Sequence, residues 1–134
     1  MTGAQVEETD NYLRKSVVCL KPEFSKMYFP IPDQRDKREL FAGVNARTFW
    51  GENMLMALVE LEPNAIVPSH HHVHEQCGIV LQGELQFTIG DESKLLKPGD
   101  VYLIPSGVEH TVIVGPKPAQ VLDVFNPVRE DFKY

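Results

Sequence analysis

The fold is indicated by two stretches of sequence, NAIVPSHHHVHEQCGIVLQG (64–83) and GDVYLIPSGVEH (99–110). In the first stretch, every second position from residue 70 carries a nitrogen or oxygen ligand: His70, His72, His74 and Gln76. In an extended strand such side chains project to one face. The second stretch ends in His110, the last of the chain's 5 histidines. We therefore expect a fold in which His110 reaches the histidine cluster from a neighbouring strand.

Short apolar segments on both sides of these stretches predict an all-β domain. They are rich in β-branched and aromatic residues, and turns containing glycine, proline, asparagine or aspartate separate them. Many short strands without helical periodicity are typical of a sandwich or a barrel. We expect strands at 39–50, 54–62, 76–82, 84–89, 93–97, 101–105, 110–115 and 120–125.

The N-terminal part of the chain follows another pattern and predicts an extension at 1–38, with the barrel at 39–134. Residues 16–20 have the composition of a short strand, and 28–32 are extended by their prolines. The charged stretch 33–40 fits one helical turn or a loop.

Composition limits the functions that this chain can have. Its 134 residues suit one domain, and 13 basic against 19 acidic residues give a formal charge of -6. Such a charge without a basic cluster argues against nucleic-acid binding. No apolar run approaches a membrane span, and the first residues lack a secretory signal. Cys19 and Cys77 form no disulfide framework. We expect a cytoplasmic protein without membrane or nucleic-acid partners.

The histidines point to a metal site. Two imidazoles two residues apart, such as His70 and His72, can bind one divalent cation when further ligands come from a neighbouring strand. His110 opens a later strand and is placed to supply one of them. Nitrogen with amide oxygen suits Zn, Ni, Fe, Co or Mn, and the sequence alone does not choose among these metals. The alternative is a set of histidines that only pack or lie on the surface.

Both stretches resemble the paired motifs of the cupin superfamily, G(X)5HXH(X)3-4E(X)6G and G(X)5PXG(X)2H(X)3N. Three positions depart from these motifs: Asn64 for the first glycine, Gln76 for the glutamate and Val114 for the asparagine. Asparagine suits the first position because it tolerates positive φ. The resemblance implies a single cupin barrel, a jelly roll or double-stranded β-helix. It also implies one divalent transition metal and its ligands: His70, His72, Gln76 and His110.

Gln76 affects the chemistry expected of such a site. Three neutral imidazoles and a neutral amide would leave the full charge of a dication inside a low-dielectric barrel. That charge attracts anions although the whole chain is acidic, and it favours Lewis-acid chemistry. It also stabilises a ferric state poorly. We therefore expect non-redox chemistry rather than oxygenation.

The last strand carries an acid and is followed by an arginine. Asp123 shares one face of the strand with Phe125, while Leu122 and Val124 share the other. Because both faces are apolar, Asp123 is expected in a lined pocket, where it could act as a general acid or base. Arg129 could bind a substrate carboxylate in a bidentate contact. The alternatives are a solvated acid and a surface ion pair between Arg129 and a neighbouring carboxylate.

These features resemble the small cupins of pectin degradation, the KdgF-type enzymes of unsaturated uronates. The resemblance rests on HHHVHEQ (70–76) and DVFNPVRED (123–131). It implies a metal-dependent isomerase or tautomerase that opens and ketonises 4,5-unsaturated uronates to 5-keto-4-deoxyuronate. Asp123 and Arg129 would serve the reaction on a small anionic sugar substrate, whose epimer the sequence does not identify.

Two other functions stay open at this point. One is a non-catalytic cupin that senses a sugar acid, and the other is a metal-dependent cupin oxygenase. The resemblance also implies a homodimer, for which residues 16–32 are the expected pairing segment.

Overall fold

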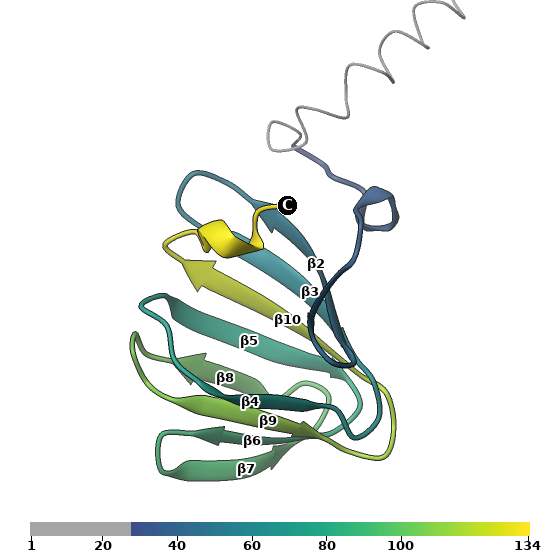
Figure 1. Cartoon of the computed structure of the whole chain (residues 1–134), viewed down its shortest axis with the longest axis vertical. Coiled ribbons are helices and arrows are strands. Elements are labelled where there is room, and N and C mark those ends of the chain that lie inside the picture. The colour runs from purple at the N-terminus through teal and green to yellow at the C-terminus, as the bar shows by residue number, and fades with distance from the viewer. Residues whose placement is uncertain (1–27) are drawn as a thin grey trace, which may run out of the picture. The chain divides into compact units, whose positions relative to one another are not determined.

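A computed structural model describes residues 28–134, which are built almost entirely from strands (Figure 1). The strands are β1 (Arg38–Phe41), β2 (Val44–Trp50), β3 (Leu55–Leu61), β4 (Ile66–His70), β5 (Glu75–Gln82), β6 (Leu85–Ile89), β7 (Glu92–Leu96), β8 (Val101–Ile104), β9 (His110–Val114) and β10 (Ala119–Asn126). Short 3-10 turns lie at η2 (Pro32–Gln34) and η3 (Glu130–Phe132). The predicted all-β class is confirmed. Within the described range no helix is long and apolar enough to cross a membrane.

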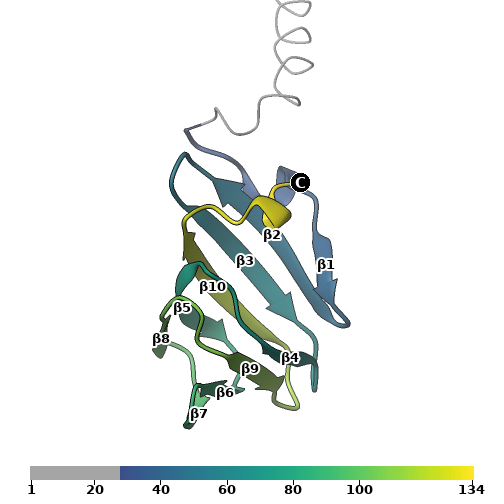
Figure 2. The ribbon, with the colours of Figure 1, turned by 60° about the vertical axis from the view of Figure 1, so that its left-hand side comes forward.

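The strands form two antiparallel sheets with a shared apolar core (Figures 1 and 2). One sheet has the order β1-β2-β3-β10-β5-β8 and the other the order β4-β9-β6-β7. Leu55 and Val121 enter the core from the first sheet, and Leu85 and Val112 enter it from the second. A polar side chain on either inner face is therefore enclosed by apolar neighbours.

Most strand predictions agree with the structure. Each predicted segment from 54–62 onward overlaps an observed strand whose ends differ from it by one residue at most. Turn chemistry explains this agreement, because glycine and proline end an extended run more sharply than they end a helix. Asn64 also has the positive φ, 62°, that its place in the first motif predicted.

The predicted strand 39–50 is wrong, because the chain folds back within it. β1 ends at Phe41, β2 begins at Val44, and the two strands pair antiparallel. Gly43 has a φ of 75°, which a glycine adopts without steric cost, and it closes this hairpin. The Ala42-Gly43 pair was the sequence signal for the turn.

The continuous strand expected through 70–76 is also wrong. β4 ends at His70, β5 begins at Glu75, and these strands belong to different sheets. The connection between them is held by hydrogen bonds to the loop before β9. Gly107 N–H donates to the carbonyl of His72, and Ser106 Oγ donates to the carbonyl of Val73.

The outer face of the six-stranded sheet is unusually apolar. Cross-strand neighbours Met56, Val124, Cys77 and Leu103 form one row over β3, β10, β5 and β8. Leu58, Leu122, Ile79 and Val101 form the next row. We call these two rows the outer apolar face. Leu103 and Val101 are 74% and 66% exposed.

The N-terminal predictions have mixed outcomes. The expected strand at 16–20 lies outside the described residues. The stretch 33–40 contains the turn η2 and then the start of β1. The chain divides into two compact units between Ile31 and Pro32, and all the described strands belong to the unit Pro32–Tyr134. A domain boundary between residues 38 and 39 stays a prediction.

Gly83 is the last residue of the first motif, and its backbone packing can be tested by comparison with Gly99, which also has a positive φ. Their φ values are 77° and 93°, so alanine at either position costs about 1 kcal/mol. Only at Gly83 would the new Cβ collide with backbone, 2.4 Å from the Pro118 carbonyl oxygen. We expect Gly83→Ala to lower the free energy of unfolding by about 1–3 kcal/mol more than Gly99→Ala does.

Urea unfolding of both variants measures this difference. Equal losses of stability would contradict the role given to the contact between Gly83 and Pro118.

Candidate metal centre

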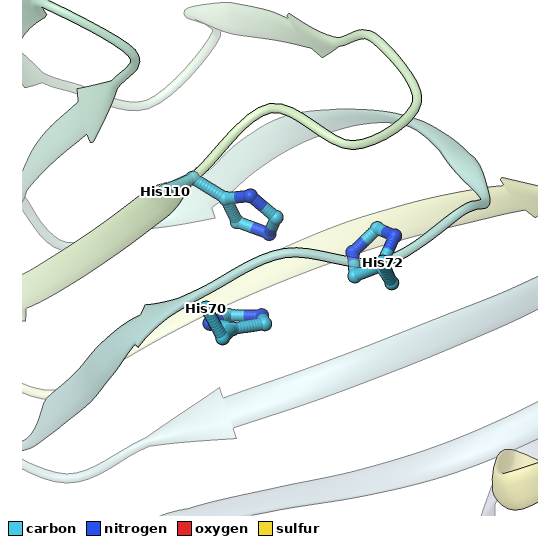
Figure 3. Close-up of side chains that lie close together, drawn as sticks. All are labelled: His70, His72 and His110. Carbon is cyan, nitrogen blue, oxygen red and sulfur yellow. The ribbon is translucent and has the colours of Figure 1, made fainter.

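Three histidines from two parts of the chain, 70–72 and 110, lie close together (Figure 3). His70 is the last residue of β4 and His110 the first of β9, and they are cross-strand partners. His72 follows in the connection to β5. One ring nitrogen from each histidine lies within 4.8 Å of the other two. Such a group could hold one metal ion.

Backbone carbonyls fix the tautomer of all three rings. The Nδ1 atoms of His70, His72 and His110 lie 2.8, 2.9 and 2.9 Å from the carbonyl oxygens of Pro68, His74 and Val108. A carbonyl oxygen only accepts, so Nδ1 carries the hydrogen in each ring. In a neutral ring Nε2 then has the free lone pair, which is the arrangement of metal-binding histidines.

Gln76 brings an oxygen to the same point from the other sheet. It is the first residue of β5 whose side chain points into the core, and this side chain is buried. Its Oε1 lies 3.1 Å from Nε2 of His72. Because that nitrogen has no hydrogen, the two atoms face each other as acceptors. Two acceptors at this distance are satisfied by a cation between or beside them.

Burial keeps the imidazoles of His110 and His72 in the neutral form, which binds metals. It lowers the pKa of His110 to about 4. It also lowers the pKa of His72, with a further contribution from the charge of Arg129. Both rings are therefore neutral at neutral pH. Nε2 of His110 is buried without a hydrogen-bond partner among the described residues. A metal ion would satisfy this nitrogen by binding its lone pair.

The donor atoms fit a divalent transition metal. Three imidazole nitrogens and one amide oxygen are compatible with Zn, Ni, Fe, Co or Mn. The structure brings together the four residues that the sequence singled out: His70, His72, Gln76 and His110. Their role as ligands, and the identity of the metal, stay predictions. His74 contributes its backbone carbonyl to the site through His72.

A cavity of about 320 Å³ extends from this cluster into the core. Its deep walls are apolar, with Leu61 and Leu85 among them, and its polar lining includes His70, Gln76 and His110. Phe41 also lines it and stacks on His70 with ring centroids 5.9 Å apart. This space suits a small molecule that has an apolar side and a few polar groups.

Asp123 lines the same cavity from the central strand β10. Tyr102 donates a hydrogen bond to its Oδ1 at 2.5 Å, and the Gln76 amide donates to its carboxyl group. Burial raises the pKa of Asp123 to about 6, although Tyr102, Gln76 and Arg129 each lower it. The burial of Asp123 confirms the predicted alternation of inward and outward side chains along β10. A carboxyl group with this pKa can both donate and accept a proton near neutrality.

Arg129 also lines the cavity, but it already has an anionic partner. Its Nε and Nη2 donate to the two carboxylate oxygens of Asp131 at 3.3 and 2.8 Å. Its guanidinium lies 3.7 Å from the ring centroid of Phe132 and 5.1 Å from that of Phe125. The ion pair that the sequence left open is present, and the stacking fixes the guanidinium at the cavity wall.

Two further residues of this site, Tyr102 and Arg38, were not predicted from the sequence. Tyr102 lies in β8 and reaches Asp123. Arg38 lines the cavity at the start of β1, and its Nη1 donates to the Asp131 carbonyl at 3.5 Å. A glycine inside a strand, Gly78, was the available signal for Tyr102, because such glycines mark close approaches. Arg38 was missed because the hairpin of β1 and β2 was predicted as a single strand that starts at residue 39.

Comparison with known proteins finds a family model, a relative in sequence and related structures. Residues 57–125 match the family model "Cupin domain". The chain is 30% identical over 109 residues to the pectin degradation protein KdgF of Dickeya dadantii, covering 80% of this chain and 98% of that protein. The structure of KdgF from Halomonas sp. has a TM-score of 0.73 at 25% identity, covering 79% of this chain and 98% of that one.

A further solved structure shows the same fold. It is an RmlC-like cupin from Shewanella frigidimarina, with a TM-score of 0.75 and 24% identity, covering 80% of this chain and 96% of that chain. With a matching family model, and with a relative that is 30% identical over nearly its whole length, the chain belongs to the cupin family.

Proposed function

We propose that this protein is a metal-dependent isomerase or tautomerase that converts 4,5-unsaturated uronates to 5-keto-4-deoxyuronate. The observation that carries the proposal is the position of Gln76. Its side chain lies between Nε2 of His72, at 3.1 Å, and the carboxyl group of Asp123, to which it donates a hydrogen bond. A proton-transferring acid is therefore adjacent to the candidate metal centre. The similarity to KdgF of Dickeya dadantii supports the substrate class.

The proposed ligands are His70, His72, Gln76 and His110, around one divalent transition metal. When bound, this ion supplies Lewis-acid polarisation of hydroxyl or carboxylate oxygens. With an amide at position 76 none of the four ligands is anionic, so an anionic sugar is attracted to the site. The neutral ligand set supports non-redox chemistry over oxygenation.

The proposed reaction is an internal rearrangement in which no atoms are lost. The C1 hydroxyl loses its proton, C1 becomes a carbonyl, and the bond between C1 and the ring oxygen breaks. The ring oxygen takes up a proton, which balances the one lost and leaves an enol at C5. C4 then gains a proton while the enol hydroxyl loses one, which gives the 5-keto product. Asp123 moves a proton onto C4, and its pKa of about 6 suits this exchange near neutrality.

Arg129 is proposed to hold the substrate carboxylate. Its stacking against Phe132 and its pairing with Asp131 restrict the rotation of the guanidinium before substrate binds. A preorganised guanidinium loses less conformational entropy on binding an anion. Asp131 weakens its net charge, so shape and direction rather than charge alone would select the substrate.

The first prediction on function concerns Asp123. We expect the wild-type protein to consume unsaturated galacturonate or mannuronate, followed as loss of the ultraviolet absorbance of the C4=C5 enol ether. Asp123→Asn should lower kcat by about 100-fold or more while substrate still binds, because the amide cannot transfer the proton. Asp91→Asn, a change at an exposed turn, is the control and should leave kcat unchanged.

Other results would favour another function. A wild-type protein that binds the uronate without consuming it would be a sugar-acid sensor. Turnover that consumes oxygen would identify an oxygenase, whereas equal rates with and without oxygen agree with the proposal.

The second prediction concerns the metal. We expect His72→Ala and His110→Ala to lose most of the bound metal, because each removes one of the converging nitrogens. His71→Ala is the matched control, since its side chain is 63% exposed and lies 3.9 Å from Glu109 instead. Elemental analysis after loading with divalent ions and dialysis measures the metal content of each variant.

A chelator should abolish turnover in the wild-type protein, and added metal should restore it. Metal retention in His72→Ala and His110→Ala at the level of His71→Ala would contradict the assigned site.

We also propose that the protein is a cytoplasmic homodimer. The outer apolar face supports self-association, because exposed apolar patches on a sheet commonly mark protein interfaces. The segment 16–32 was the expected pairing region from the sequence, and 16–27 lies outside the described residues.

The third prediction tests this interface. Leu103→Lys places a charge at the β8 edge of the outer apolar face, where this face is most exposed, and should shift the protein from dimer to monomer. Ile113→Lys is the control, because Ile113 is 50% exposed on the four-stranded sheet and should leave the dimer intact. Light scattering after size-exclusion chromatography gives the mass. A dimer that survives Leu103→Lys would direct attention to residues 16–32, and a monomeric wild-type protein would refute the proposal.

A further inference from the structure

Tyr102 reaches Asp123 across an intervening strand. The two residues lie in β8 and β10, which flank β5, and Gly78 of β5 is the cross-strand partner of both. Two strand spacings amount to about 9.5 Å, so the backbones of β8 and β10 are not neighbours. The tyrosine side chain is long enough to cross this gap, and its hydroxyl donates to Oδ1 of Asp123 at 2.5 Å.

Gly78 makes this crossing possible. A Cβ at position 78 would lie 2.3 Å from Cζ and from the hydroxyl oxygen of Tyr102. Any other residue there would force the ring away from the β5 backbone. Since φ at Gly78 is not in the left-handed region, the close approach of the ring is the reason why glycine is needed.

The ring of Tyr102 is also held from the opposite sheet. Phe87 of β6 packs against it with ring centroids 4.5 Å apart. The side chain is buried, and its hydroxyl is directed across β5 to Asp123 at the cavity. The tyrosine therefore has one packed orientation, which hydrogen-bonds the carboxyl group that also accepts from Gln76.

We propose that Tyr102 is a positioning residue for the reaction: its hydroxyl, passing over Gly78, fixes the orientation of the Asp123 carboxyl group beside Gln76 and the substrate cavity. The proposal rests on the proposed function, in which Asp123 transfers the proton. Because one oxygen of the carboxyl group is held by Tyr102, the other oxygen has a fixed position relative to the rest of the site. Misplacement of a proton-transferring group slows the chemical step more than it weakens substrate binding.

The test uses Tyr102→Phe, which removes the hydroxyl and keeps the ring against Phe87. We expect kcat to fall about 10- to 100-fold, since a hydrogen bond to a charged group is lost, while KM changes by less than about twofold. Metal content should equal that of the wild-type protein. Phe87→Leu, which alters the packing of the ring but leaves the hydroxyl, is the matched variant and should reduce kcat less than Tyr102→Phe does.

Gly78→Ala provides an independent approach to the same geometry. The added methyl group should displace the tyrosine ring and lower kcat in the same direction as Tyr102→Phe. Gly51→Ala is its control, because a Cβ at position 51 meets no atom within 4 Å. Tyr102→Phe alone decides the matter if Gly78→Ala fails to fold.

A double-mutant cycle separates this inference from the proposed function. The free energy of unfolding is measured for Tyr102→Phe, Asp123→Ala and the double variant, without any substrate, because alanine removes the accepting oxygen. We expect the two changes to be non-additive, because the residues share one hydrogen bond. If the wild-type protein does not turn over unsaturated uronates, the proposed function fails, and the positioning of Asp123 is then judged by this cycle.

Two results would overturn the inference. Wild-type kcat in Tyr102→Phe, whatever its stability, would make Tyr102 a core residue only. Additive effects in the cycle would mean that the hydroxyl does not hold the carboxyl group.

Discussion

The candidate metal centre depends on three hydrogen bonds from imidazole Nδ1 atoms to backbone carbonyls. They fix the tautomers of His70, His72 and His110, and they leave three Nε2 lone pairs directed at a common point. Convergent acceptors repel one another, so the rest of the fold has to restrain these three side chains. The pairing of β4 with β9 and the hydrogen bonds of the connection 71–74 supply that restraint. The cavity, the acid and the arginine gain chemical meaning only in relation to this point.

Motif spacing predicted which side chains the fold brings together, because the motif residues lie at or near the ends of strands. The intervals from His70 to Gln76 and from Gly99 to His110 identified the four residues that the fold brings together. Strand ends were also predictable, since turn-forming residues interrupt each apolar run. Period-two alternation placed Asp123 on the inner face of β10, where it is buried.

What the sequence did not predict depends on contacts between distant residues. The hairpin at Gly43 interrupts a segment that has the pattern of one strand. The stretch 70–76 also has the pattern of one strand, but it leads from β4 in one sheet to β5 in the other. No local pattern shows that Tyr102 crosses β5, because that contact requires a glycine on a strand adjacent in space and distant in sequence. The pairing of Arg129 with Asp131 was only one of two open choices, and stacking against Phe132 decides its position.

The position of β10 in its sheet explains how the catalytic candidates can be held precisely. β10 is hydrogen-bonded on both sides, to β3 and to β5, so its register is fixed twice. A slip of one residue would place Leu122 in the cavity and Asp123 on the outer apolar face. β8 is an edge strand and has only one such ladder. The hydrogen bond from Tyr102 to Asp123 therefore works in both directions: it orients the carboxyl group, and it ties the edge strand to the centre of the sheet.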